Sequence, residues 1–255
     1  MKEKILQRLK EIEQTYGVKI IYAVESGSRM WGFSSPDSDY DVRFIYVSKP
    51  QAYLTVKERP DYIEFMDKTL DLDFAGWDIK KALYLLNKSN MSLYEWLNSP
   101  AVYITTPQAE EFKKLAQNFW DNKKLIYSYI HLAQGNYNKY ILGRTPVKLK
   151  KYLYILRTIA ACIYIEKHRT VPPITAEELL PAVKQDDVYV SGFFEKIIKA
   201  KKAGEELSEQ HPDTAVNKWI EDKLTYYKNF AADIPVEKKD LSPLDAFLYK
   251  TVMKN

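Results

Sequence analysis

Two closely spaced aspartates at the start of a hydrophobic segment are the residues of this sequence best placed to do chemistry. Asp39 and Asp41 stand at the beginning of segment 40–48, which is β-rich and alternates as a strand does. Because residues two apart in a strand point the same way, both carboxylates project from one face at one end of it. Such close carboxylates repel each other unless a cation lies between them, although an isolated Asp-x-Asp is also typical of a turn or a solvated strand end.

A second aspartate pair lies on the next segment with a strand pattern. Asp71 and Asp73 alternate with apolar residues in segment 69–77. Neighbouring strands would bring Asp73 beside the first pair, and Asp71, which shares its strand face, is the competing third carboxylate. Three converging carboxylates are the hard oxygen ligands that suit Mg²⁺ when it is shared with nucleotide phosphates.

The residues before the first aspartate pair indicate a phosphate site. Segment 18–25 is β-branched and aromatic and predicts a buried strand, which Gly27, Ser28 and Arg29 follow at the start of a short helical element. Glycine lets the backbone approach a ligand closely, and exposed amides at a helix start bind phosphate oxygens. The serine hydroxyl and the arginine charge add to that interaction. Each part is weak alone, but the order of strand, Gly-Ser, Asp-x-Asp strand and further Asp strand is uncommon.

Composition restricts both the class of protein and the class of metal. The chain has 255 residues, of which 46% are hydrophobic and 28% charged, so it can form a core and is not disordered in composition. One cysteine and three histidines exclude an internal disulfide framework and argue against a Cys- or His-based metal site. Carboxylates and a hard cation, Mg²⁺ or in its place Mn²⁺, remain. Residues 1–14 lack the features of a secretory signal and no apolar run is long enough to span a membrane, so we expect a cytoplasmic location and no membrane contact.

Charge is spread unevenly along the chain. Residues 25–78 contain 11 Asp/Glu against 6 Lys/Arg, whereas residues 79–169 contain 15 Lys/Arg against 5 Asp/Glu, a balance of +10. This asymmetry favours a polyanion-binding face in the basic part, with ordinary solvated helix faces as the alternative. Lys150 and Arg157 fall on one helical face and Lys151 is adjacent, so we interpret them as a clamp for nucleotide or RNA phosphates, with structural ion pairs as the alternative.

Strands give way to helices near residues 100–106. Apolar residues at three-to-four spacing predict helices over 2–16, 79–89, 92–99, 106–142, 146–168, 175–183, 191–204 and 211–231. Lys80 and Lys81 begin one of these helices, where they either contact phosphate or are solvated. Segment 51–68 is irregular, with room for an edge strand. We therefore predict an α+β fold, in which a small mixed β-sheet domain with flanking helices at 1–105 precedes an all-helical domain at 106–255.

The order of these motifs resembles the signature of the polymerase-β-like nucleotidyltransferase superfamily. The motifs are Gly-Ser at 27–28, Asp-Tyr-Asp-Val at 39–42 and the later Asp73. The longer words SGSRMWGFSSPDSDYDVRFIY, LDFAGWDIKKALYLLNKSN, VKLKKYLYILR and VPPI are similar to one branch of it, the RNA-repair-associated RlaP nucleotidyltransferases. The resemblance extends to about residue 183, and the later residues carry no specific motif.

The resemblance implies a mechanism and a set of partners. Gly27 and Ser28 would hold the triphosphate of an NTP. Two Mg²⁺ ions would bind Asp39 and Asp41, with Asp73 as the third carboxylate. An acceptor hydroxyl, on an RNA end, would attack the α-phosphorus and release pyrophosphate. Three alternative functions stay open. They are transfer to a protein or small molecule, a non-catalytic nucleotide- or RNA-binding module, and a component of a toxin–antitoxin or repair complex. The sequence also leaves the base of the NTP and the oligomeric state open.

Overall fold

The protein is described by a computed structural model that divides into two compact units. The described residues are 1–205, 207, 209–235 and 238–254. The first unit contains residues 1–30, 39–120 and 238–255, and the second contains residues 31–38 and 121–237. The predicted division into domains at 1–105 and 106–255 stays a prediction, because compactness alone does not show which part folds or acts by itself.

The first unit is built on a mixed sheet that has five strands in the described part of the chain, in the order β3-β4-β2-β1-β5. The strands are β1 (Val18–Glu25), β2 (Tyr40–Ser48), β3 (Tyr62–Asp67), β4 (Leu72–Asp78) and β5 (Val102–Thr105). β2 and β4 run parallel, and the other neighbouring pairs run antiparallel. The strands predicted at 18–25, 40–48 and 69–77 are confirmed, with the last beginning later at Leu72, and β3 is the edge strand expected within 51–68.

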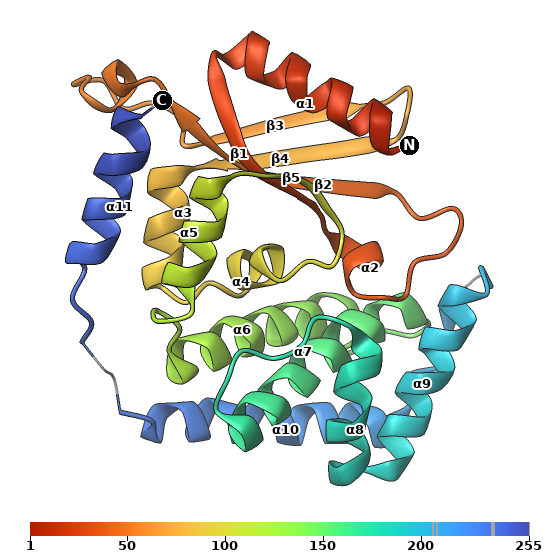
Figure 1. Ribbon diagram of the computed structural model, residues 1–255. Helices are drawn as coiled ribbons and strands as arrows, with labels where there is room; N and C mark the ends of the chain where they lie inside the picture. Colours follow the sequence, from red (N-terminus) through yellow and green to blue (C-terminus); the bar gives the residue numbers. More distant parts are fainter. Residues whose placement is uncertain (206, 208, 236–237, 255) are drawn as a thin grey trace. The chain divides into compact units, whose positions relative to one another are not determined.

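Helices cover both faces of this sheet. They are α1 (Lys2–Tyr16), α2 (Gly27–Met30), the 3₁₀ helix η1 (Pro50–Tyr53), α3 (Ile79–Asn87), α4 (Met91–Leu97), α5 (Pro107–Ala116) and α11 (Ser242–Met253). α1 lies along one face, whereas α3 and α5 lie on the other (Figure 1). Leu9 of α1 belongs to a buried cluster with Val42, Phe44 and Phe74. Strand alternation therefore turns the residues between them, Asp41 and Asp73 among them, toward the opposite face.

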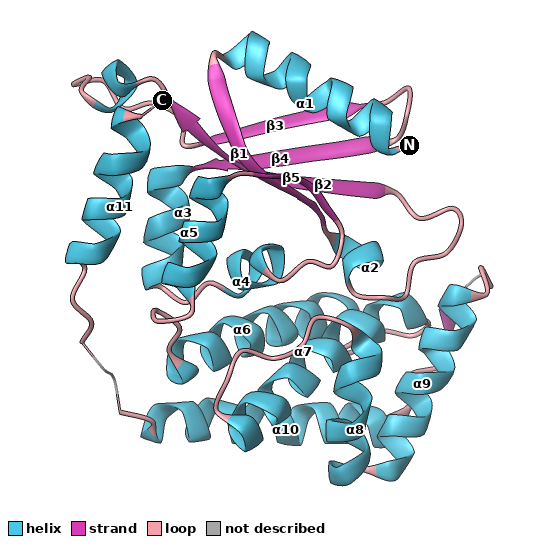
Figure 2. Ribbon diagram, in the orientation of Figure 1, coloured by secondary structure: helices cyan, strands magenta, loops and turns pink. Residues whose placement is uncertain are grey.

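The second unit is helical, as Figure 2 shows. Its helices are α6 (Asn122–Tyr140), α7 (Leu149–His168), α8 (Ala176–Asp186), α9 (Val188–Lys202) and α10 (Thr214–Asp233), and β6 (Val147–Lys148) pairs with β7 (Glu209–Gln210). Segment 31–38 also packs here, since the Ala176 amide donates to the Trp31 carbonyl at 3.0 Å and Lys201 Nζ contacts Ser35 Oγ at 2.9 Å. Among the helices of the described residues, none combines the length and the apolar composition needed to cross a membrane.

The single helix predicted over 106–142 is wrong. α5 ends at Ala116 and α6 begins at Asn122. The Asp121 carboxylate accepts a hydrogen bond from the Lys124 amide at 2.9 Å, which satisfies a free donor of the first turn and starts a new helix. The apolar periodicity continues across the break because both helices bury one face, so periodicity alone could not reveal it. α11 was not predicted at all.

Candidate active site

Asp41 and Asp73 are neighbours across the parallel pair formed by β2 and β4. Each is the second residue of its strand, and the register pairs Asp41 with Asp73. Their sequence neighbours Val42 and Phe74 are fully buried on the α1 side of the sheet. Both carboxylates remain partly accessible, with 31% and 36% of the side chain exposed. The parallel pairing therefore brings Asp73 beside Asp41 at the end of the sheet where β2 and β4 begin.

The Arg43 guanidinium contacts both carboxylates. Its Nη2 donates to Asp41 Oδ1 at 3.2 Å and to Asp73 Oδ2 at 2.8 Å. Its Nη1 donates to the Asp73 carbonyl oxygen at 3.1 Å. Because adjacent carboxylates repel each other, this cation offsets the repulsion that the strand register imposes. Arg43 was not among the predicted site residues, although strand periodicity carries the signal, since Arg43 stands two residues after Asp41 and must share its face.

The three predicted carboxylates do not form one cluster. Among the residues that the structure describes, no group of three or more Asp, Glu, His or Cys side chains is arranged to hold a metal ion. Asp39 is exposed and lies just before β2. Asp71, the competing third carboxylate, is exposed in the turn before β4 with a φ of 55°. The cluster thus consists of two carboxylates and one guanidinium, which leaves a formal charge of −1.

Gly27 lies against the Asp41 carboxylate. Its φ is +60°, a left-handed conformation that favours glycine. A Cβ atom at this position would lie 2.0 Å from Asp41 Oδ2, which is far inside van der Waals contact. The neighbouring Ser26 amide donates to the Asp41 carbonyl at 2.8 Å, so the backbone here follows the start of β2 closely. A glycine is therefore needed at position 27 because the Asp41 carboxylate occupies the space of a side chain. The sequence alone did not reveal this reason.

Ser28 and Arg29 follow Gly27 in α2. Both side chains are half-buried. The Arg29 Nε donates to the Asp39 carbonyl at 3.2 Å, and its guanidinium lies 3.7 Å from the centre of the Tyr40 ring. These contacts tie α2 to the beginning of β2 and hold the segment that carries Asp39. Arg29 therefore has a structural role in this conformation, whatever it contacts in a nucleotide complex.

Glu25 holds the backbone of Asp41 and Tyr103 holds Glu25, and neither residue was among the predicted site residues. Glu25 ends β1 and is only 2% exposed. Its Oε1 accepts the Asp41 amide at 2.8 Å, and its Oε2 accepts the Tyr103 hydroxyl. Burial raises the pKa of the Glu25 carboxyl, and the two hydrogen bonds act in the opposite direction. The pairing of β1 with β2 brings Glu25 to the Asp41 amide, and the short strand β5 brings Tyr103 to Glu25. Both contacts join residues far apart in the chain, so local sequence patterns carry no signal for them.

The basic residues predicted to clamp phosphates lie on α7 in the second unit. Lys150 is exposed, and the Lys151 ammonium lies 3.9 Å from the centre of the Tyr140 ring. Arg157 is 2% exposed, with its guanidinium 4.1 Å from the centre of the Trp31 ring. Lys150 and Lys151 thus remain candidates for a phosphate contact made at the surface. The burial of Arg157 favours a packing role within the second unit.

The chain is similar in sequence to known proteins over nearly its whole length. The family model described as "RlaP: RNA repair pathway DNA polymerase beta family" matches residues 1–250. A protein of Bacillus subtilis (strain 168), named "Uncharacterized protein YcgL", is 42% identical over 254 residues, which cover 99% of this chain and 96% of that protein. A crystal structure of a nucleotidyltransferase-like protein from Exiguobacterium sibiricum 255-15 is 16% identical, with 98% of this chain and 80% of that chain covered. Its TM-score of 0.34 is too low to establish a common fold.

Proposed function

The chain belongs to the RlaP family of polymerase-β-type nucleotidyltransferases, and from this premise we propose that it transfers a nucleoside monophosphate from an NTP to a hydroxyl of RNA in a Mg²⁺-dependent reaction. The observation that carries the proposal is the pairing of Asp41 with Asp73 around one cation, Arg43. A polymerase-β-type reaction requires carboxylates and positive charge next to a triphosphate. The RNA acceptor is favoured by the family description and by the basic segment 79–169.

The residues around Asp41 fit a divalent cation. The Arg43 guanidinium donates hydrogen bonds to both carboxylates. It marks a position where a positive charge is stabilised by the two side chains. The net charge of −1 that remains favours a further positive charge. Asp41 and Asp73 would hold Mg²⁺. Asp39, the third predicted ligand, is exposed just before β2 and lies outside their cluster in this conformation, so it is proposed to join them only when the metal binds. When bound, Mg²⁺ neutralises charge on the phosphate oxygens and lowers the pKa of the attacking hydroxyl.

The chain's own residues orient the reactants. Ser28 donates its hydroxyl to a phosphate oxygen, and Gly27, which has no side chain, leaves the Asp41 carboxylate in place beside the triphosphate. Asp73 accepts the proton of the acceptor hydroxyl as its oxygen bonds to the α-phosphorus. The bond from the α-phosphorus to the β-phosphate bridging oxygen breaks, and pyrophosphate leaves with the electron pair. Glu25 holds the Asp41 backbone through the Asp41 amide during this exchange.

The test is the fate of the phosphate label. We expect the label of an α-³²P-NTP to move to an RNA oligonucleotide with a free 3′-hydroxyl, while the label of a γ-³²P-NTP appears only in pyrophosphate. Each of the four NTPs is tried with Mg²⁺, with Mn²⁺ and with EDTA, and a mixture of denatured proteins replaces the RNA in a parallel series. Label on protein with none on RNA would overturn the RNA acceptor and favour protein modification. Transfer that persists in EDTA would overturn the metal dependence.

Lys150, which is exposed, and Lys151, which is half-buried, are proposed to contact the phosphates of the acceptor. Each phosphate contact releases counterions, so binding of single-stranded RNA weakens with salt at a slope of about −0.7 per contact. We expect the Lys150→Gln/Lys151→Gln double variant to bind RNA more weakly and to lose about 1.4 of that slope. Fluorescence anisotropy of a labelled RNA at several salt concentrations measures both quantities.

A matched pair on the same unit controls for general charge. Lys196 and Lys228 are exposed and form no ion pair within the described residues. The Lys196→Gln/Lys228→Gln variant should keep the slope of the wild-type protein. An unchanged slope in the α7 variant would remove this face from the RNA site. A loss of NTP affinity with intact RNA binding would instead assign it to the nucleotide.

A further inference from the structure

A pocket of about 640 Å³ lies in the first unit at the end of β2 and β4 that is opposite to Asp41 and Asp73. Ser48, which ends β2, and Asp78, which ends β4, both line it. At about 3.3 Å per residue, β2 separates Asp41 from Ser48 by about 23 Å. A ligand bound here would therefore not reach the aspartates, and the pocket is not part of the site described above. Its volume falls in the range of about 300–1,000 Å³ typical of small-molecule sites.

Three carboxylates, those of Glu58, Asp61 and Asp78, line this pocket. Asp78 is 7% exposed and accepts hydrogen bonds from the Tyr53 hydroxyl at 2.9 Å and the Lys80 amide at 2.8 Å. The Ser48 hydroxyl also donates to Asp78 Oδ2 at 3.4 Å. These donors fix the orientation of the carboxylate and leave Oδ1, which accepts one bond, with room for a further donor, because a carboxylate accepts about four bonds. Asp61 pairs with the Lys81 ammonium at 2.8 Å at the start of α3. The pocket thus presents acceptors that suit the amino group of a base, which carboxylates recognise in nucleic acids.

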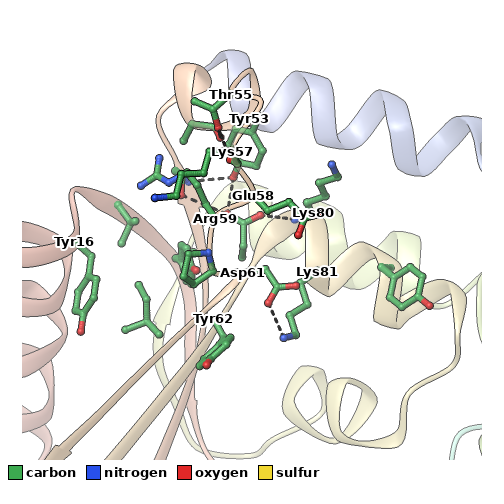
Figure 3. A pocket seen from close by; sticks show the side chains of 18 of the residues that line it. Tyr16, Tyr53, Thr55, Lys57, Glu58, Arg59, Asp61, Tyr62, Lys80 and Lys81 are labelled. Atoms are coloured by element: carbon green, nitrogen blue, oxygen red, sulfur yellow. Dashed lines mark hydrogen bonds and ion pairs between the residues drawn. The ribbon is translucent and has the colours of Figure 1, made fainter.

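Three cations surround the opening. Lys57, Arg59 and Lys80 are exposed and line the pocket, and within the described residues none of them forms an ion pair with a carboxylate. Lys57 and Arg59 belong to the segment between η1 and β3, whereas Lys80 comes from α3. Figure 3 shows Lys80 and Lys81 on one side of the pocket and Tyr16 on the other, with Arg59 between them. Cations from different elements around one opening are suited to a phosphate group.

Tyrosine rings form much of the remaining lining. Tyr16, Tyr62 and Tyr84 come from α1, β3 and α3, and they are 46%, 49% and 61% exposed. Rings this accessible at a pocket wall are available for stacking, and tyrosine stacks on every base because each base has a π-face. The Lys81 ammonium lies 5.1 Å from the centre of the Tyr62 ring and restricts its position. The pocket therefore combines aromatic rings, carboxylate acceptors and cations in one lining.

We propose that this pocket is a second binding site that takes a nucleoside phosphate, either as a free nucleotide or as one unit of a single-stranded RNA. The base stacks on tyrosine, its amino group meets the carboxylates, and its phosphate meets Lys57, Arg59 and Lys80. An acidic peptide would use the cations but would be repelled by Asp61 and Asp78. Inorganic phosphate would leave the rings and the carboxylates unused. The proposal goes beyond the transfer reaction and stands without it, because the two sites lie at opposite ends of the strands.

The test is binding in the absence of catalysis. The Asp41→Asn protein in EDTA is titrated by calorimetry with the four nucleoside monophosphates, a single-stranded RNA hexamer, ribose 5-phosphate, inorganic phosphate and a glutamate-rich peptide. We expect at least one monophosphate or the hexamer to bind about tenfold or more tightly than ribose 5-phosphate. The added Lys57→Gln/Arg59→Gln/Lys80→Gln substitutions should weaken that binding about tenfold or more. Lys2→Gln/Lys4→Gln/Lys10→Gln, which removes the same charge from exposed positions of α1, should leave it unchanged.

The outcomes separate the sources of the ligand and the rival explanations. Binding of monophosphates identifies a free-nucleotide site, and binding of the hexamer alone identifies an RNA site. Equal affinity for ribose 5-phosphate or inorganic phosphate would overturn the proposal, because the base would then contribute nothing. So would preferential binding of the peptide, equal losses in both lysine variants, or no binding of any probe. Since the Asp41→Asn background cannot depend on transfer, failure here leaves the proposed enzymatic function untouched.

Discussion

Nucleotidyl transfer is expected to fall by at least about 100-fold in Asp41→Asn and in Asp73→Asn. Each substitution removes a carboxylate that would hold Mg²⁺, and a metal ion supplies several kcal/mol of transition-state stabilisation, at about 1.4 kcal/mol per tenfold in rate. Both side chains are partly exposed and lie at a strand start, so the loss of charge should leave the fold intact. Single-turnover transfer rates measure the effect, with circular dichroism and thermal unfolding as checks on folding.

Asp71→Asn is the matched control for these two variants. Asp71 stands two residues before Asp73 but is exposed in the turn that precedes β4. Its φ of 55° is a left-handed conformation that asparagine also adopts, so the turn should be preserved. We expect near-normal transfer and normal Mn²⁺ binding in Asp71→Asn. Loss of transfer in this variant with retention in Asp73→Asn would reverse the assignment of the third carboxylate.

The proximity of Asp41 and Asp73 could be predicted because it depends on two local rules. Alternation in a strand turns Asp41 away from the core, and the short apolar segments identify the strands that carry it and Asp73. The same rules predicted that the acidic segments lie in a mixed sheet. They did not give the register of β2 against β4, which is fixed by contacts between residues about 30 positions apart. Local sequence patterns do not determine such contacts. The proximity of the two carboxylates could therefore be predicted, but not which residues of β2 and β4 lie opposite each other.

The supporting contacts could not be predicted for the same reason. Glu25 reaches the Asp41 amide only because β1 pairs with β2, and Tyr103 reaches Glu25 only because β5 pairs with β1. β5 has four residues, too few for a periodic pattern. The break between α5 and α6 depends on the cap formed by Asp121, which periodicity across it concealed. The sequence thus predicts which strand carries the chemistry better than it predicts what surrounds that strand.

Gly27→Ala is expected to lose both nucleotidyl transfer and metal binding. The loss of metal binding would show that the substitution acts by displacing the Asp41 carboxylate. A β-carbon at Gly27 would lie 2.0 Å from Asp41 Oδ2 and 2.9 Å from its carboxyl carbon, so the carboxylate must move. The sequence-based explanation was different, because it placed the triphosphate against this glycine. Displacement of Asp41 predicts that Mn²⁺ binding weakens about tenfold or more without any NTP, whereas crowding of the triphosphate predicts normal Mn²⁺ binding and weaker NTP binding.

Gly17→Ala separates this collision from backbone strain. Gly17 ends α1 with a φ of +61°, nearly the φ of Gly27, but apart from its two chain neighbours no residue has an atom within 4 Å of the position that its β-carbon would take. A left-handed alanine costs about 1–2 kcal/mol at either position, so Gly17→Ala measures the strain alone, whereas Gly27→Ala adds the collision with Asp41. Only Gly27→Ala should lose Mn²⁺ binding, measured by electron paramagnetic resonance of the free ion. If Gly27→Ala binds Mn²⁺ normally but NTP weakly, the triphosphate rather than Asp41 sets the requirement for glycine. If both variants bind the metal and the nucleotide normally, Gly27 is a structural turn residue and the phosphate site lies elsewhere.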